Sequence, residues 1–350
     1  MSNEFDDFDF IEHYGGEEDA TSQDTLPENE AASALNCGFV GVGGGGGKMA
    51  KAFLDLGFNK TILVNTTEKD QPADVDPKHL VLIPDADGVA KDVEFGKKVF
   101  TDNGAVVEDA LRTKLGKVDW LFVFAGGGGG TGSASPALKA VFDRYLKSIN
   151  AEGSVVYVAS IPSGQEALND TIKNNANSLL NDLSGATHIA LSNEKQLQLL
   201  RGKAGMLNMF PLANSTFAKL FWQILKLASE KSPIQSFDSR DLERCLGTKG
   251  RMFIGSTVIK DPKVGNLGAS IFQNCLKRSP CPPPRDKAAT GTMLLVVSPE
   301  MADDPEISKH IESAISYVGG RTETLFSGVY VRPSVPGLVA IVAMNGLDWN

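Results

Sequence analysis

Several features of secreted, membrane-spanning and zinc-binding proteins are scarce or missing in this sequence. It has four cysteines and four histidines among 350 residues, and no CxxC pair. Reduced thiols are therefore favoured over a disulfide framework or a zinc site. No run of 18 apolar residues is present, and the first residues lack the basic and apolar segments of a signal peptide. We therefore expect no transmembrane helix and a cytoplasmic location.

Basic residues are absent from the first 34 positions, which hold eleven acidic residues. Such a segment repels itself and buries little apolar surface, so we expect residues 1–34 to form a disordered acidic tail. The tail is either a solvated leader or a docking peptide for a cargo, an adaptor or a neighbouring subunit, because apolar side chains are interleaved with its acids. These are Phe5, Phe8, Phe10, Ile11 and Tyr14. The sequence contains no cluster of lysines and arginines that would indicate a nucleic-acid surface.

Apolar runs of strand length alternate with amphipathic helical segments through the first 200 residues. This alternation predicts an α/β fold with a parallel sheet that helices cover on both faces. Residues at about 92–115 are expected to be helical, and a long apolar helix at 206–230 precedes a smaller α/β domain. The strands expected before the long helix are "CGFVGV", "TILVNT", "HLVLIP", "DWLFVFA", "GSVVYVASIP" and "THIALSN". Those expected after it are "RMFIGSTVI", "GTMLLVVSP", "GVYVRP" and "GLVAIVAM".

Two glycine-rich loops each follow a predicted strand, at 41–48 and 126–133. Glycine allows the backbone to approach a phosphate, and consecutive N–H groups at a helix start bind anions. The first loop contains a GxGxxG spacing typical of dinucleotide sites, but it is not a Walker A motif, because Met49 follows Lys48. A dinucleotide site leaves the second loop unexplained. Two loops at neighbouring strand ends can hold the phosphates of one nucleotide from two sides.

Five short segments can be compared with known motifs in their order along the chain. They are "GVGGGGGK" (41–48), "VNTT" (64–67), "GGGGGTGS" (126–133), "SNEKQL" (192–197) and "FPLANSTF" (210–217). The third resembles GGGTG[ST]G, the signature of the tubulin/FtsZ superfamily of filament-forming GTPases, and the others resemble further loops of that superfamily. The resemblance covers roughly residues 36–345. It implies a Rossmann-like GTPase domain at 35–205, a central helix at 206–230 and a C-terminal activation domain at 231–350.

The resemblance implies that the chain binds GTP or GDP with Mg²⁺, and it gives the matching residues roles. Asn65 and Thr66 would line the ribose–phosphate side, and Glu166 would face the ribose. Asn193 would support the base, although it is equally consistent with a cap at the end of a strand. The residues implied at the phosphates are Gly43, Gly44, Gly45, Gly46, Gly47, Lys48, Gly127, Gly128, Gly129, Gly130, Thr131, Gly132 and Ser133.

The base contacts would come from the start of the central helix. Phe210 and Asn214 are spaced i, i+4, so they share one face of a helix. The resemblance implies that Phe210 stacks on the base and that the Asn214 amide pairs with the edge of guanine. Core packing is the alternative for both side chains.

The segment "IQSFDSRDLERCL" at 234–246 matches the loop that carries the catalytic acids in the superfamily. Asp238 and Asp241 would orient and polarise the attacking water. The resemblance implies that they act on the nucleotide of the next subunit, so that the chain is its own partner in a head-to-tail homopolymer. The alternative is that both acids only cap a helix, since aspartate is common at that position.

Three departures from the FtsZ motifs suggest a divergent, plasmid-type or phage-type member. Lys48 replaces an asparagine, Ser236 replaces another asparagine, and Ala134 stands at the last signature glycine. The leading hypothesis is a polymerising GTPase in a prokaryotic cytoplasm, including that of a plasmid-bearing or phage-infected cell. A nucleotide-gated scaffold with little hydrolysis is the second hypothesis, and an NAD-type oxidoreductase is the third.

Overall fold

The computed structural model describes residues 33–72, 74–84, 86–201, 204–205, 207–333, 335 and 337–348. Residues 1–32 of the predicted acidic tail lie outside these residues. Ala34 belongs to the folded part, because its amide donates to the Leu225 carbonyl at 3.1 Å. The described fold therefore starts slightly before the predicted boundary at residue 35.

The strands of the described residues form one ten-stranded sheet in the order β3-β2-β1-β4-β5-β6-β7-β10-β8-β9. Neighbours from β3 to β7 are parallel, β10 is antiparallel to both of its neighbours, and β8 and β9 are parallel. The sheet therefore continues through the β6–β7 pair into the C-terminal half. The strands are β1 Cys37–Val42, β2 Thr61–Asn65, β3 Leu80–Leu82, β4 Trp120–Gly126, β5 Val155–Ile161, β6 Thr187–Ser192, β7 Gly250–Ile259, β8 Ala288–Val297, β9 Thr322–Val331 and β10 Leu338–Leu347.

The α/β prediction is confirmed, and every predicted strand is present. The α-helices are α3 Gly43–Asp55, α4 Val93–Asp102, α5 Gly104–Ala110, α6 Gly130–Ser133, α7 Lys139–Ser148, α8 Asp170–Leu183, α9 Asn193–Leu200, α10 Met209–Ser229, α11 Ser239–Gly247, α12 Leu267–Arg278, α13 Pro299–Ala302 and α14 Pro305–Gly319. The helical segment predicted at about 92–115 is confirmed as α4, α5 and a π-helical turn at Leu111–Leu115. Asn103 interrupts it, because this residue leaves helical geometry and its side-chain amide donates to the Val99 carbonyl at 3.0 Å.

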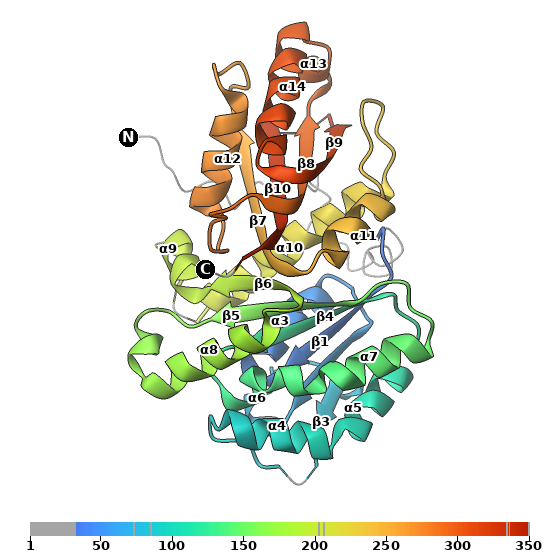
Figure 1. Cartoon of the computed structure of the whole chain (residues 1–350), viewed down its shortest axis with the longest axis vertical. Helices are drawn as coiled ribbons and strands as arrows, with labels where there is room; N and C mark the ends of the chain where they lie inside the picture. Colours follow the sequence, from blue (N-terminus) through green and yellow to red (C-terminus); the bar gives the residue numbers. More distant parts are fainter. Residues whose placement is uncertain are drawn as a thin grey trace.

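Helices cover both faces of the parallel part of the sheet (Figure 1). Phe39 of β1 packs with α3 and α10 on one face, whereas Val40 and Val42 pack with α4, α5, α7 and α8 on the other. This alternation follows from the strand geometry, because successive side chains point to opposite faces. Among the described residues, no helix is long and apolar enough to cross a membrane.

The helix α10 occupies the position predicted for a central helix, between the parallel strands and the C-terminal half. It is fixed to the first half by aromatic pairs, among them Phe122 with Phe221 at 4.9 Å and Phe58 with Trp222 at 5.6 Å between ring centroids. Phe53 of α3 also contacts Phe221, at 6.2 Å. Such pairs stabilise beyond their buried area by about 0.5–1.5 kcal/mol each. The helix that begins at the first glycine loop is therefore packed firmly against α10.

Candidate functional site

A cavity of about 460 Å³ lies at the carboxyl ends of the parallel strands. This is the edge at which ligands bind in open α/β sheets, and the volume lies in the range of small-molecule pockets. Both glycine loops contribute to its wall. The lining residues are Gly44, Gly45, Thr67, Asp70, Gly88, Val89, Ala90, Lys91, Gly126, Gly127, Gly128, Gly129, Gly130, Thr131, Gly132, Ser160, Pro162, Glu166, Ile172 and Asn193.

The first glycine loop is the start of α3, which follows β1 directly. Gly43 has φ +70°, a left-handed conformation that favours glycine and allows this abrupt transition from strand to helix. Val42 is the N-cap residue and makes no side-chain cap bond. The first N–H groups of α3 are therefore available to an anion at the positive end of the helix dipole. Gly44 and Gly45, in this first turn, line the cavity.

Gly46 and Gly47 are buried, and Lys48 is exposed on α3. A Cβ at Gly46 would lie 2.1 Å from the Phe124 carbonyl oxygen. Gly46 therefore has a packing role, since it lets α3 approach β4. Neither Gly43 nor these three residues is among the residues that line the cavity.

The second glycine loop joins β4 to the short helix α6. A Cβ at Gly132 would lie 2.5 Å from the Gly126 carbonyl oxygen, so the loop folds tightly on itself. Thr131 carries the loop hydroxyl at the cavity, and its Oγ1 is 2.9 Å from Thr66 Oγ1. This bond joins the loop to the turn after β2. Ser133 Oγ is fully buried and has no hydrogen-bond partner among the described residues.

The turn after β2 uses Asn65 internally. This side chain is only 3% exposed, and its Oδ1 accepts the Thr66 amide at 2.8 Å. The predicted contacts of Asn65, Thr66 and Ser133 with a ligand are not supported by the cavity lining, which includes none of the three. Thr66 contacts the cavity wall through its bond to Thr131, and the direct contacts of these three residues with a ligand stay a prediction.

Glu166 and Asn193 meet at the far wall of the cavity. Glu166 Oε2 accepts the Ser163 amide at 2.7 Å, the Ser163 hydroxyl at 2.9 Å and the Asn193 amide at 3.4 Å. Asn193 Oδ1 accepts the Ser160 hydroxyl at 2.8 Å. This network joins the ends of β5 and β6, and it brings together two residues that lie 27 positions apart.

Two parts of the cavity wall were not expected from the sequence. Asp70 lies beside the first glycine loop, where a Cβ at Gly44 would be 3.2 Å from the Asp70 Cβ. The segment 88–91 supplies Lys91, the basic side chain among the described lining residues. Ala90 and Lys91 both have positive φ, at 47° and 66°. Asn175 Nδ2 donates to the Lys91 carbonyl at 2.9 Å and holds this unusual backbone.

Phe210 and Asn214 lie on the first turns of α10, outside the described lining. Phe210 is 37% exposed and Asn214 is half-buried. Phe210 therefore does not pack in the core, which was the alternative interpretation. The structure does not bring either side chain to the glycine loops, and their contacts with a base stay a prediction.

Asp238 and Asp241 lie at the start of α11, which is well separated from α6 (Figure 1). Asp238 Oδ1 accepts the amides of Arg240 at 2.9 Å and Asp241 at 3.0 Å. Asp241 Oδ2 accepts the Asp238 amide at 3.3 Å, which completes a capping box. Burial raises the pKa of the Asp241 carboxyl above its usual value. Neither acid lines the cavity.

Comparison with solved structures identifies the fold. CetZ2 from Haloferax volcanii, solved as a GTPγS-bound protofilament, is 20% identical with a TM-score of 0.72, over 90% of this chain and 94% of CetZ2. A GTPγS-form protofilament of TubZ from Bacillus thuringiensis serovar israelensis is 17% identical with a TM-score of 0.73, over 92% of each chain. TubZ of the Clostridium botulinum phage c-st is 19% identical with a TM-score of 0.65, over 89% of this chain and 92% of TubZ.

No family model and no curated protein matches the sequence. The structural likeness extends over almost the whole chain, so it concerns the complete arrangement and not one shared motif. The chain has the tubulin/FtsZ fold, as its motifs predicted.

Proposed function

We propose that this chain binds and hydrolyses GTP, and that it polymerises head to tail into filaments with an active site completed by the next subunit. The observation that carries the proposal is the cavity formed by two glycine loops at the carboxyl ends of β1 and β4. Consecutive backbone N–H groups and a helix start suit a chain of phosphates. The nucleotide-bound protofilaments among the similar structures support the same proposal.

The proposed units follow the predicted boundaries: a GTPase domain at 35–205, a central helix at 206–230 and an activation domain at 231–350. The first unit would bind the phosphates through both glycine loops and Thr131. The start of α10 would contact the base through Phe210 and Asn214. The start of α10 would have to approach the cavity to bring these two side chains to a bound guanine.

The residues at the cavity fit a magnesium nucleotide. Asp70 and Thr67 offer oxygen ligands, which Mg²⁺ prefers. Within the described part of the chain, no group of three or more metal-ligating side chains could hold a metal alone. The ion would therefore be shared with phosphate oxygens. When bound, Mg²⁺ would neutralise charge on the phosphates.

Hydrolysis would require the acids of a neighbouring subunit. Asp238 and Asp241 would orient a water whose oxygen attacks the γ-phosphorus, while the bond to the β-phosphate oxygen breaks and GDP leaves. The water proton would pass to a carboxylate or to the phosphate. Because α10 has 21 residues, at about 1.5 Å per residue it carries the chain about 32 Å before the loop that leads to these acids.

A second function is a nucleotide-gated scaffold with little hydrolysis. The capping box favours it, because both acids already stabilise the start of α11. GTP turnover measured against protein concentration separates the two functions. A polymerising GTPase gives a steep rise in turnover per subunit above a critical concentration. If the protein pellets as filaments in the presence of GTP but releases no phosphate, this result would contradict the proposed hydrolysis.

The proposed partners and location follow from this function. The chain would assemble with itself in a prokaryotic cytoplasm, which includes that of a phage-infected or plasmid-bearing cell. The acidic segment 1–32 would dock a cargo or an adaptor. Deletion of this segment should change bundling or partner binding while GTP affinity of the monomer is kept.

A further inference from the structure

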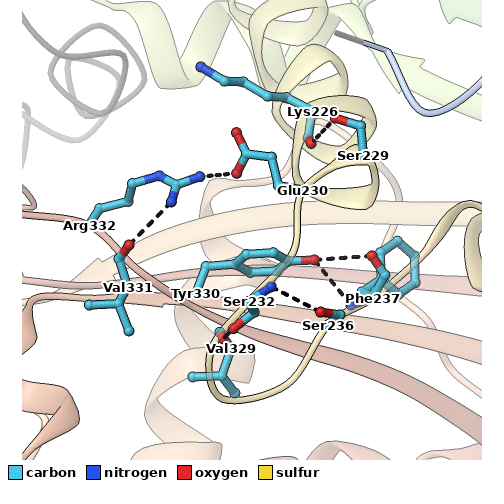
Figure 2. Close-up of polar contacts among 10 residues, drawn as sticks. All are labelled: Lys226, Ser229, Glu230, Ser232, Ser236, Phe237, Val329, Tyr330, Val331 and Arg332. Carbon is cyan, nitrogen blue, oxygen red and sulfur yellow. Dashed lines mark hydrogen bonds and ion pairs between the residues drawn. The ribbon is translucent and has the colours of Figure 1, made fainter.

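The loop between α10 and α11 is attached to the outermost strand of the sheet, β9. Arg332, just after β9, forms an ion pair with Glu230 at the end of α10. The Ser232 hydroxyl donates to the Val329 carbonyl, and the Val329 amide donates to the Gln235 carbonyl at 2.8 Å. Figure 2 shows the ion pair between Arg332 and Glu230. The loop is therefore held along its length before it reaches the acids.

The last attachment is made by Tyr330. Its hydroxyl accepts the Phe237 amide at 3.1 Å and donates to the Phe237 carbonyl at 3.0 Å (Figure 2). Both residues are fully buried. Burial raises the pKa of Tyr330, so the hydroxyl keeps the proton that it donates. One side chain thus satisfies both backbone groups of a single residue in the loop.

The close approach of this loop to β9 also requires a particular residue on the strand. A Cβ at Gly328 would lie 2.9 Å from the Phe237 Cβ and 2.7 Å from a ring carbon of Tyr330. Glycine at this position therefore gives room for the Tyr330 ring and for the backbone and Cβ of Phe237. The contact between Phe237 and Tyr330 is thus built by two positions of β9.

We infer that Tyr330 is a positioning residue for the catalytic acids, an inference that rests on the proposed function. Phe237 immediately precedes Asp238, the N-cap residue of α11. Fixing the amide and the carbonyl of Phe237 fixes the peptide that leads into Asp238. The capping box then transmits this orientation to Asp241. A phenylalanine would fill the same core volume, but it would hold neither backbone group.

The test compares Tyr330→Phe with Tyr145→Phe in preassembled filaments. Tyr145 is a matched control, because it is also fully buried and its hydroxyl donates to a backbone carbonyl, that of Gly116, at 2.6 Å. We expect Tyr330→Phe to lower turnover per polymerised subunit about 10-fold, with GTP affinity unchanged, since small misplacement of reacting groups costs up to about 10²-fold. Tyr145→Phe should keep turnover within about 2-fold of the unsubstituted protein.

A double-mutant cycle with Asp241→Asn distinguishes positioning from a general structural effect. If Tyr330 acts through the acids, Tyr330→Phe should lower the residual turnover of Asp241→Asn filaments by less than about 2-fold, because coupled effects are not additive. Radiolabelled phosphate release gives the sensitivity that this background needs. An undiminished effect of Tyr330→Phe in this background would overturn the inference, as would equal turnover in Tyr330→Phe and Tyr145→Phe.

Misfolding of the variant and failure of the proposed function can each be distinguished from failure of this inference. If Tyr330→Phe does not fold, Ser232→Ala loosens the same loop and is carried through the same cycle. If filaments of the unsubstituted protein release no phosphate, the proposed function fails, and this inference fails with it. Normal turnover in the unsubstituted protein and in Tyr330→Phe contradicts the positioning role alone.

Discussion

The two acids at the start of α11 show how one side chain can serve both structure and the proposed catalysis. The capping bonds use Oδ1 of Asp238 and Oδ2 of Asp241. A carboxylate has two oxygens and about four acceptor positions, so capping does not exhaust either group. The cap alternative and the catalytic hypothesis are therefore compatible, and a substitution that keeps the cap can separate them.

Asp241→Asn is that substitution, because the asparagine oxygen can still accept the Asp238 amide. We expect turnover in filaments to fall about 10²-fold, the usual scale for a lost acid–base group, with GTP binding retained. Phosphate release and nucleotide affinity are the measurements. Asp304→Asn is the control, since Asp304 caps α14 through the amides of Glu306 and Ile307. Equal turnover in both variants would leave the acids as helix caps only.

His188 predicts a pH dependence of stability. It is 1% exposed on β6, and burial lowers its pKa from the ordinary value of 6.5. Below about pH 6.5 the unfolded chain therefore takes up a proton that the folded chain does not, and stability falls as the pH decreases. We expect Tm to drop between pH 7 and pH 5, and His188→Gln to flatten this drop. Calorimetry of both proteins across this range is the measurement, and parallel curves would refute the assignment.

At the scale of elements, the second glycine loop uses the small size of glycine for two different purposes. One is close packing of the chain on itself, and the other is open space in the cavity. Gly132 must be small because the chain folds back on Gly126. Gly129 meets nothing within 4 Å among the described residues, and its φ of −94° suits any residue. Its small size therefore serves the open space of the cavity that it lines, and not the packing of the fold.

Gly129→Ala should consequently weaken GTP binding without loss of stability. The added methyl group would occupy space at the loop, and loss of one hydrogen bond to a charged oxygen costs about 1.5–3 kcal/mol, or about 10-fold to 150-fold in affinity. Gly185→Ala is the matched control, because Gly185 also meets nothing within 4 Å and does not line the cavity. Titration with a fluorescent GTP analogue and a thermal melt test the pair. Unchanged affinity in Gly129→Ala would place the phosphates elsewhere.

The strands and loops around the cavity show which parts of the site could be predicted from the sequence. Buried strands were predictable because their apolar runs are continuous, and glycine loops were predictable because the residue itself marks the backbone. Asp70 was not predictable, since it stands beyond the "VNTT" motif and reaches the cavity only through the fold of its turn. The segment 88–91 carries no motif, and its left-handed backbone depends on the distant Asn175.

For the molecule as a whole, the order of the strands separates the two proposed halves of the active site. The cavity lies at the ends of β1, β4, β5 and β6, whereas the acids follow α10 and are attached to β9, the last strand of the sheet. The sequence predicted a smaller C-terminal α/β domain, and it gave no sign that the strands of this part continue the same sheet through β6 and β7. Local patterns identify strands, whereas such a junction depends on contacts between distant segments.

This separation predicts that mixing two inactive variants restores activity. A nucleotide-blocked variant, Thr131→Ala with Gly129→Ala, would bind no GTP but would still present Asp238 and Asp241 to a neighbour. Asp241→Asn would bind GTP but lack a complete acid pair. Subunits in a head-to-tail stack meet through heterologous contacts, which build open filaments. In such a stack, the nucleotide-blocked variant completes the site on the Asp241→Asn variant. We therefore expect mixed filaments to regain part of the turnover, measured as phosphate release at constant total protein.

Asp241→Asn mixed with Asp238→Asn is the control, because neither protein carries both acids. Turnover per subunit that stays constant from dilute monomer to polymer would contradict a shared site, because a site within one chain would need no neighbour.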